Sequence, residues 1–405
     1  MRLNVLFFSL FSVLAVKGQE TFKVLVENPL PISQKDVPVV ISLEPFGDVS
    51  RSIVKVNEKE IPSQLDDLNL DEKMDELCFL ADLGPHETQT YNISLDAEGA
   101  PVPYPSRVYT EMLMRNDKVK EKNKHNNFVS SLSVRGDCAN SYNLLHHHGV
   151  CFESELNGIR IYFDNRQTLD LYGKFQPRLE LKETQFYTSK EQKEQGYGDD
   201  VLWVGNTFGL GAMRGWNGSE PTMVDPVKTR TQRVISYGPL RTIVEVIDQG
   251  WEVTPGLPAV NMTLRYVQYA GHRDTDVHVI FNRPADAYRF STGLINVKGS
   301  VEFSDHKGLR ACWGTDYPST DTVNWKRETV GLAILLPKEN IVSEQQANKD
   351  NYPFVVKVKD RQMSYKVAYT SANESFGFSD PKAWFEWLRQ WRRTVENPVK
   401  VKVVR

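Results

Sequence analysis

Hydrophobic and polar residues alternate along most of the chain, in runs short enough to be β-strands. In residues 159–164, Ile159, Ile161 and Phe163 are separated by polar or amphipathic side chains. Successive side chains of a strand point to opposite faces, so this alternation is typical of a strand with one buried face. Comparable runs occupy residues 37–43, 233–247, 261–268, 275–282 and 330–336. The pattern predicts an all-β protein of antiparallel strands.

The same patterning divides the chain into two β-domains and a linker. Residues 19–100 carry turn signals about every 8–12 residues, which is the rhythm of a β-sandwich. Pro101, Pro103 and Pro105 then restrain the backbone to extended conformations, and the charged run 118–127 lacks apolar periodicity. We expect a small N-terminal β-sandwich over residues 19–100, a linker and exposed loop over 101–127, and a large two-sheet β-domain over 128–405.

One amphipathic helix is predicted near the end of the chain. Asp380 is a capping residue and is followed by Pro381, which is favoured in the first turn of a helix. The apolar residues that follow at positions i, i+3, i+4 and i+7 are Trp384, Trp387, Leu388 and Trp391. A regular stripe of this kind normally packs on a core, and an aromatic platform for sugars is the alternative.

The first residues have the layout of a secretory signal peptide. Arg2 is followed by an apolar run from Val5 to Val16 and then by Lys17-Gly18, where cleavage is expected. The run is too short to cross a bilayer comfortably, and no cysteine follows it to carry a lipid anchor. We expect residues 1–18 to be a signal peptide, the protein to be periplasmic or secreted, and no membrane insertion after the signal is removed.

Charge and composition narrow the class of partner. Lys and Arg number 49 against 52 Asp and Glu, which gives a net charge of -3. No basic stripe or arginine-rich tail is present, so the sequence predicts no nucleic-acid partner.

The cysteines and the acidic residues give little indication of a metal. No cysteine pair has CxxC spacing, so a structural zinc site is not indicated, and either free buried thiols or one disulfide is expected. The four residues are Cys78, Cys138, Cys151 and Cys312. Asp67, Asn69 and Asp71 match the start of a calcium loop, but Glu72 replaces the required glycine. We expect no cofactor and no metal, with calcium as the alternative.

The stretch from Leu144 to Lys174 combines three consecutive histidines with carboxylates and a lysine. If it is extended, His146 and His148 point one way, and His147 points the other way with Glu153. Asn157-Gly158 is a strong hairpin signal between its two apolar runs. The polar side chains are therefore expected on one sheet face, where they would line a groove.

These residue types suit acid–base chemistry on a sugar. Imidazole titrates near neutral pH, and an acid opposite it would complete an epimerase, a lyase or a hydrolase site. The candidate catalytic residues are His147, His148, Asp170, Tyr172, Asp199 and Asp200. The candidate substrate-binding residues are Glu153, Arg160, Lys174, Tyr197 and Arg241. A self-satisfied hydrogen-bond network is the alternative for the histidines, and a structural ion pair with Glu245 or another acid is favoured for Arg241.

Several motifs resemble those of a bacterial family, the domain of unknown function numbered 4861. They are Gln64-Leu65-Asp66-Asp67, Asp75-Glu76-Leu77, His147-His148-Gly149, Asp170-Leu171-Tyr172-Gly173-Lys174, Gly196-Tyr197-Gly198-Asp199-Asp200, and Tyr237-Gly238-Pro239 with Arg241. The resemblance covers essentially the whole chain after the signal peptide. It implies an exported protein of a polysaccharide-degrading system, often a pectin-type one. The part from about Phe128 also resembles the galactose-mutarotase-like β-supersandwich.

Two functions from different classes follow. The first is an exported carbohydrate-active enzyme that acts on plant polysaccharide fragments, with uronate-bearing ones such as pectin as one substrate class. The second is a non-catalytic glycan-binding protein of a polysaccharide-utilisation system. A concave pocket holding a histidine and a carboxylate would favour the enzyme. An open aromatic platform, with the motif residues hydrogen-bonded among themselves, would favour binding.

Overall fold

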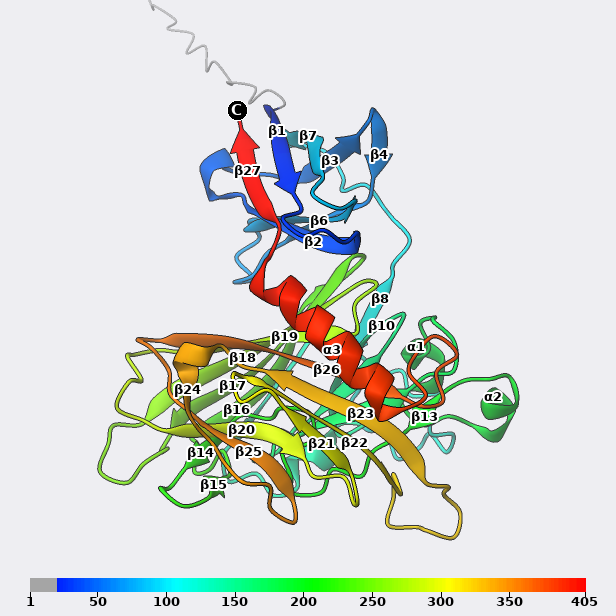
Figure 1. Ribbon diagram of the computed structural model, residues 1–405, viewed down its shortest axis with the longest axis vertical. Coiled ribbons are helices and arrows are strands. Elements are labelled where there is room, and N and C mark those ends of the chain that lie inside the picture. Colours follow the sequence, from blue (N-terminus) through cyan, green and yellow to red (C-terminus); the bar gives the residue numbers. More distant parts are fainter. Residues whose placement is uncertain (1–19) are drawn as a thin grey trace, which may run out of the picture.

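The computed structural model describes residues 20–405, so the predicted signal peptide lies outside the described residues. The described chain is built from antiparallel β-strands and has one long helix, α3 (Pro381–Glu396). A small β-domain stands above a larger one in Figure 1, and α3 runs across the face of the larger domain toward the small one. The prediction of an all-β protein with a C-terminal amphipathic helix is confirmed. Within residues 20–405, no helix combines the length and apolar character needed to span a membrane.

The N-terminal domain is a sandwich of a five-stranded and a three-stranded sheet. The first sheet has the order β27-β1-β7-β3-β4 and the second β2-β6-β5. The strands are β1 (Glu20–Glu27), β2 (Gln34–Ser42), β3 (Arg51–Val56), β4 (Lys59–Ile61), β5 (Ser63–Asp66), β6 (Glu76–Leu83), β7 (Thr88–Asp96) and β27 (Lys400–Val404). The short helix η1 (Glu44–Phe46) follows β2. Alternate residues such as Val24, Val39, Phe79 and Ile93 fill the core between the sheets.

The last strand returns to the first domain. Lys400 to Val404 pairs with β1 in an antiparallel register, and Lys400 forms an ion pair with Glu27. The predicted range 128–405 for the large domain therefore includes one strand that belongs to the N-terminal sandwich. No local pattern reveals this, because it depends on pairing between opposite ends of the chain.

The large domain packs a nine-stranded sheet against two five-stranded sheets. The nine-stranded sheet consists of β21 (Val301–Ser304), β22 (Leu309–Asp316), β23 (Glu328–Leu335), β26 (Gln362–Ser371), β19 (Asp274–Phe281), β18 (Val260–Tyr269), β17 (Arg241–Trp251), β16 (Thr229–Tyr237) and β9 (Ser131–Arg135). One five-stranded sheet consists of β15 (Pro221–Thr222), β14 (Arg214–Trp216), β20 (Phe290–Ile295), β25 (Asn351–Val356) and β24 (Ile341–Glu344). The other consists of β13 (Asp199–Asp200), β12 (Leu169–Gly173), β11 (Gly158–Tyr162), β10 (Gly149–Ser154) and β8 (Val108–Glu111).

The connections that matter for the site are short helices and the predicted linker. Residues 97–107 have no regular structure, but β8 follows them inside the predicted linker range and pairs with β10. The short helices are η2 (Ser141–Leu144), α1 (Leu181–Thr184), α2 (Lys190–Glu194) and η3 (Lys338–Asn340). The polar segment between β12 and β13, which contains α1 and α2, becomes the cover of the polar residues described below.

Helix α3 packs its apolar stripe on the outer face of the nine-stranded sheet. The Asp380 side chain caps the helix by accepting a hydrogen bond from the Ala383 N–H at 3.0 Å. Trp384, Leu388 and Trp391 are buried against β22, β23 and β26. The core interpretation of the tryptophan stripe is therefore the correct one, and burial of these large side chains fixes α3 to the sheet.

Candidate functional site

The three histidines lie in a turn and not in a strand. His146, His147 and His148 follow η2 and precede β10, which begins at Gly149. His148 has a φ of 69°, a left-handed conformation that is incompatible with the extended backbone expected from the sequence. The prediction that alternate histidines face opposite sides of a strand is therefore wrong.

The polar residues of the neighbouring strands do share one sheet face, as predicted. The pairing sets Arg160 opposite Asp170, Tyr172 opposite Asp200, and Cys151 opposite both Arg160 and Glu111. The other face carries apolar side chains that belong to the core of the large domain. We call the following set the polar sheet face: Glu111, Cys151, Glu153, Arg160, Asp170, Tyr172 and Asp200.

The polar sheet face is covered and does not line a groove. Leu181 and Phe186, from the segment between β12 and β13, pack on Cys151 and Tyr172. Within this set, all side chains except that of Asp200 are buried. A sugar therefore has no access to them, and the expected open groove at this face is wrong.

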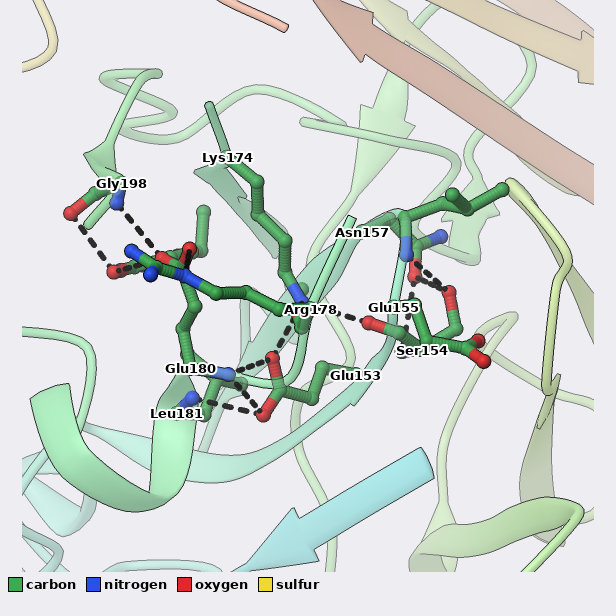
Figure 2. A network of polar contacts seen from close by, with 12 residues as sticks. Glu153, Ser154, Glu155, Asn157, Lys174, Arg178, Glu180, Leu181 and Gly198 are labelled. Atoms are coloured by element: carbon green, nitrogen blue, oxygen red, sulfur yellow. Dashed lines mark hydrogen bonds and ion pairs between the residues drawn. The ribbon is translucent and has the colours of Figure 1, made fainter. Parts of the chain in front are cut away.

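Lys174 forms an ion pair with Glu153 (Figure 2), and both side chains are completely enclosed. Its Nζ donates to Glu153 Oε2 at 2.6 Å and to the backbone oxygens of Ser154 and Arg178 at 2.7 Å. Glu153 also accepts from the N–H groups of Glu180 and Leu181 at 2.8–2.9 Å. All three ammonium donors are used, so neither Lys174 nor Glu153 is free to hold a substrate carboxylate.

Tyr172 and Tyr197 help to hold the segment between β12 and β13 over the polar sheet face. The Tyr172 hydroxyl lies 3.0 Å from Glu180 Oε2 and 2.8 Å from the Gly198 oxygen, and burial raises the pKa of Tyr172. Tyr197 stacks under the Arg178 guanidinium at 4.0 Å. A Cβ at Gly198 would lie 1.8 Å from the Gly173 oxygen, so this close approach requires glycine. The motifs 170–174 and 196–200 thus hold the segment between β12 and β13 against β12.

Arg160 joins the two aspartates of the polar sheet face. Its guanidinium donates to Asp170 Oδ2 at 2.7 and 3.0 Å and to Asp200 Oδ2 at 2.8 Å. The ring of Phe186 covers the guanidinium at 4.2 Å. Burial, reinforced by Asp170, raises the pKa of Asp200 well above its ordinary value, although Arg160 opposes the shift. Asp200 is the member of this group that reaches solvent, with 13% of its side chain exposed.

His147 is enclosed, and burial favours the neutral forms of His146 and His148. His147 is sealed, with Nδ1 2.8 Å from the Gly149 oxygen and Nε2 3.2 Å from Glu111 Oε1. Burial lowers the pKa of His146 to about 3 and that of His148 to about 4. His148 is half-buried between Tyr142 and Tyr162. The structure places none of them in an open cavity beside a carboxylate.

Arg241 lies at the contact between the two domains. Its guanidinium donates to Asp66 Oδ2 at 2.7 and 2.8 Å and to Glu76 Oε2 at 2.7 Å. Gln64 accepts from the N–H groups of Leu240 and Arg241. The favoured interpretation as a structural ion pair is correct, but the partners are Asp66 and Glu76 and not Glu245. This assembly, which we call the domain clamp, explains the motifs at Gln64 and Tyr237.

An exposed corner remains where β13 ends. Trp203 follows Asp200 by three residues and is 51% exposed. It borders a recess of about 40 Å³ that we call the strand-end recess. The recess is lined by Val201, Leu202, Trp203, Ile295, Asn296, Val297, Lys298, Asp316, Tyr317, Glu328 and Val330.

Carboxylates gather at this corner. Asp316 ends β22 and lies directly opposite Glu328, the first residue of β23. Asp199 forms an ion pair with Lys193, whose Nζ lies 4.8 Å from the Trp325 ring. Burial raises the pKa values of both Asp199 and Glu328, and the charge of Asp199 adds to the shift of Glu328. Like charges opposed across strands are destabilising, and clustered acids with raised pKa values are typical of functional sites.

A family model matches residues 26–401, nearly the whole described chain; its description is "Domain of unknown function (DUF4861)". The chain belongs to the DUF4861 family. None of the curated proteins matches it. This family member is similar in structure to a protein in the glycosyl hydrolase family 38 from Enterococcus faecalis, with a TM-score of 0.52 and 8% identity. The match covers 95% of this chain and 47% of the Enterococcus faecalis protein, so this chain spans about half the length of that protein.

A second solved structure is a putative aldose 1-epimerase from Klebsiella pneumoniae subsp. pneumoniae. The TM-score is 0.28 at 10% identity, and the match covers 65% of this DUF4861 chain and 91% of the other. The likeness to the glycosyl hydrolase protein shows a similar fold. It assigns no reaction to the DUF4861 chain.

Sequence reasoning missed half of the exposed corner. Asp199 and Asp200 were candidates, and Glu328 and Asp316 were not, because they lie in strands more than 100 positions later. What distinguishes Asp316 and Glu328 is that they lie opposite each other, and this can be known only from the register of β22 and β23. Glu111 and Glu180, which contact His147 and Tyr172, were also missed, because tertiary folding and not a local motif brings them there.

A larger cavity lies elsewhere in the large domain. It has a volume of about 640 Å³ and lies between the end of α3 and the outer face of β19 and β26. His278, Lys338, Lys366, Arg392 and Val395 are among its lining residues. Lys366 and Arg392 are already paired with acids, and no tryptophan lines the cavity. No sequence-predicted site residue contributes to it.

The four cysteines and the acidic turn at Asp67 are the residues on which the disulfide and calcium expectations depend. All four cysteines are free thiols, and three of them are buried as one of the two expectations had it; Cys138 is partly exposed. Asp67 uses both carboxylate oxygens to accept N–H groups of its own turn, including those of Leu70 and Glu72 at 2.6 and 2.7 Å. This arrangement is an acidic turn in which backbone N–H groups occupy both oxygens of Asp67.

Proposed function

We propose that this protein is an exported glycan-binding protein of a polysaccharide-utilisation system, and that the sugar lies over the strand-end recess. The motif residues of the polar sheet face are covered and hydrogen-bonded among themselves, which argues against catalysis at that face and favours glycan binding elsewhere. The observation that carries the proposal is the half-exposed Trp203 beside the carboxylates Asp316 and Glu328, which line the same recess. Aromatic faces and carboxylates together suit the apolar face and the hydroxyl groups of a pyranose.

The size of the recess supports a surface mode of binding. A volume of about 40 Å³ is far below the roughly 300–1,000 Å³ of pockets that enclose a small molecule. The sugar would therefore lie across the corner as part of a chain. The excess of carboxylates over Lys193 and Lys298 favours a neutral plant oligosaccharide over a uronate-bearing one such as pectin.

Trp203→Ala is expected to weaken binding at least about tenfold, because truncation of an aromatic anchor costs about 2 kcal/mol. The glycan is first identified on a panel of neutral and uronate oligosaccharides from plant cell walls, and affinity is then measured by calorimetry. The melting temperature should not change, since half of the side chain is in solvent.

His278→Ala in the 640 Å³ cavity is the matched control for this experiment and should bind the glycan like the wild type. Loss of affinity in His278→Ala with normal binding by Trp203→Ala would place the sugar beneath α3 and refute the recess. Wild-type protein that binds no glycan on the panel would refute the binding function itself.

An acid–base enzyme at the same corner is the second candidate, favoured by the raised pKa values of Asp199, Asp200 and Glu328. An Asp200 carboxyl with a raised pKa keeps its proton to higher pH and can donate it. Turnover would then fall as the pH rises through that pKa, because the acid loses its proton. Asp200→Asn should abolish this limb of the pH–rate profile and most of the turnover. Asp164→Asn, outside the corner, should leave both unchanged; a normal profile in Asp200→Asn would exclude Asp200 as the acid.

A further inference from the structure

Three side chains of different chemistry converge at the edge of the polar sheet face. They are Glu111 at the end of β8, His147 in the histidine turn and Cys151 in β10. Cys151 and Glu111 are directly opposite each other in the strand pair, so their backbone positions are fixed by the sheet. All three are buried, with exposures of 0–2%. In the described residues, this is the one such group of three metal-ligating side chains.

The separations of the three donor atoms suit three of the four positions around a tetrahedral ion. His147 Nε2 lies 3.2 Å from Glu111 Oε1 and 3.6 Å from Cys151 Sγ, and Sγ lies 3.9 Å from Oε1. Tetrahedral zinc bonds of about 2.0–2.3 Å would separate nitrogen from oxygen by about 3.3 Å, and sulfur from either by about 3.5 Å. The nitrogen–oxygen and nitrogen–sulfur distances are already close to these values. The sulfur–oxygen distance would have to shorten by a few tenths of an ångström.

The hydrogen bonds orient the donors toward a shared cation. His147 Nδ1 lies 2.8 Å from the Gly149 oxygen, which only accepts, so Nδ1 donates to that oxygen and is not available to a metal. Nε2 is the ring nitrogen that faces Glu111 and Cys151. Tyr109 donates to the other Glu111 oxygen at 2.6 Å. A backbone carbonyl behind the imidazole and a hydroxyl behind the carboxylate are the usual outer partners of metal ligands.

Two more imidazoles adjoin the group and have unused nitrogens. The His146 ring lies 5.5 Å from that of His147, and the His125 ring stacks on His146 at 3.8 Å. His146 Nε2 and His125 Nδ1 are buried and have no hydrogen-bond partner among residues 20–405. Buried nitrogens without partners are uncommon in proteins, and two of them adjoin this group.

We propose that Glu111, His147 and Cys151 bind a zinc ion, which fastens the histidine turn to β8 and β10. Thiolate and imidazole ligands select zinc over magnesium or calcium, which prefer oxygen. The site is sealed, so the ion would enter during folding and contribute to the stability of this edge. In this role His147 is a structural ligand, and the proposal does not depend on where a sugar binds. The absence of CxxC spacing hid the site, because its ligands come from three separate segments.

Metal content tests the proposal without any assay of activity. Protein produced in zinc-supplemented medium and purified without a metal column should contain about one zinc per chain by mass spectrometry of the elements. Cobalt reconstitution should give a thiolate-to-cobalt charge-transfer band. Cys151→Ser and His147→Gln should lose both signals. Cys312→Ser, which removes an equally buried thiol with no histidine contact, should keep both.

Two results would overturn the proposal. One is wild-type protein with no bound transition metal and no thiolate band after reconstitution. The other is zinc retained at the wild-type level in folded Cys151→Ser and His147→Gln. If both variants fail to fold, the zinc content and the cobalt spectrum of the wild type decide the matter alone.

Discussion

Lys174→Met is expected to lower the free energy of unfolding by about 3–5 kcal/mol, because it leaves the Glu153 carboxylate buried without its cation. Both side chains are fully enclosed, and their contact measures 2.6 Å. Burial already favours the neutral form of Glu153 and raises its pKa, while Lys174 opposes that shift. The measurement is chemical denaturation followed by tryptophan fluorescence at neutral pH.

Two further variants separate this effect from loss of packing. Lys174→Met combined with Glu153→Gln should recover more than half of the loss, because the uncompensated charge is gone while the amide oxygen still accepts the N–H groups of Glu180 and Leu181. Lys400→Met removes a Lys–Glu pair of nearly equal length at the surface and should cost at most about 1 kcal/mol. Equal costs for Lys174→Met and Lys400→Met would contradict the assignment of a buried structural pair.

Arg241→Met is expected to be similarly damaging, at about 3–5 kcal/mol, because the Asp66 carboxylate would lose its guanidinium partner inside the domain clamp. The two domains should also separate more readily, so limited proteolysis should cut the proline-containing segment 97–107 earlier than in the wild type. Unfolding curves and the time course of cleavage measure the two effects.

Arg233→Met is the matched control for the clamp. Arg233 also pairs with a buried acid, Glu245, but Arg265 binds that acid as well at 2.8 Å, so no carboxylate is left alone. The cost should be clearly smaller, and cleavage of 97–107 should be unchanged. A loss of stability as large as that of Arg241→Met would show that the clamp has no special role.

Local pattern sufficed for elements such as β11 and α3, because strand and helix periodicities depend on neighbouring residues. The alternation around Ile159 and Ile161 identified the core face of β11, and Asp380 with the tryptophan stripe identified α3. It also indicated that Arg160 and Asp170 share the opposite face. The sequence could not show that residues 175–198 fold over this face, since that cover is a tertiary contact.

The candidate site was harder to predict for the same reason. Arg241 contacts Asp66 across 175 positions of sequence, and Glu328 meets Asp316 through the register of two strands. Charged residues in motifs suggest catalysis, but in this fold most of them neutralise one another in closed networks. The exposed chemistry lies at a corner where only Asp199 and Asp200 belong to a recognisable motif.

The most direct test of this account is a crystal structure of the protein with the oligosaccharide selected on the glycan panel. We expect a sugar ring over the Trp203 side chain, with hydroxyl groups within hydrogen-bonding distance of Asp316 or Glu328, and the polar sheet face still covered. A sugar bound in the cavity beneath α3, or in contact with His147 or Lys174 after displacement of the cover, would contradict it.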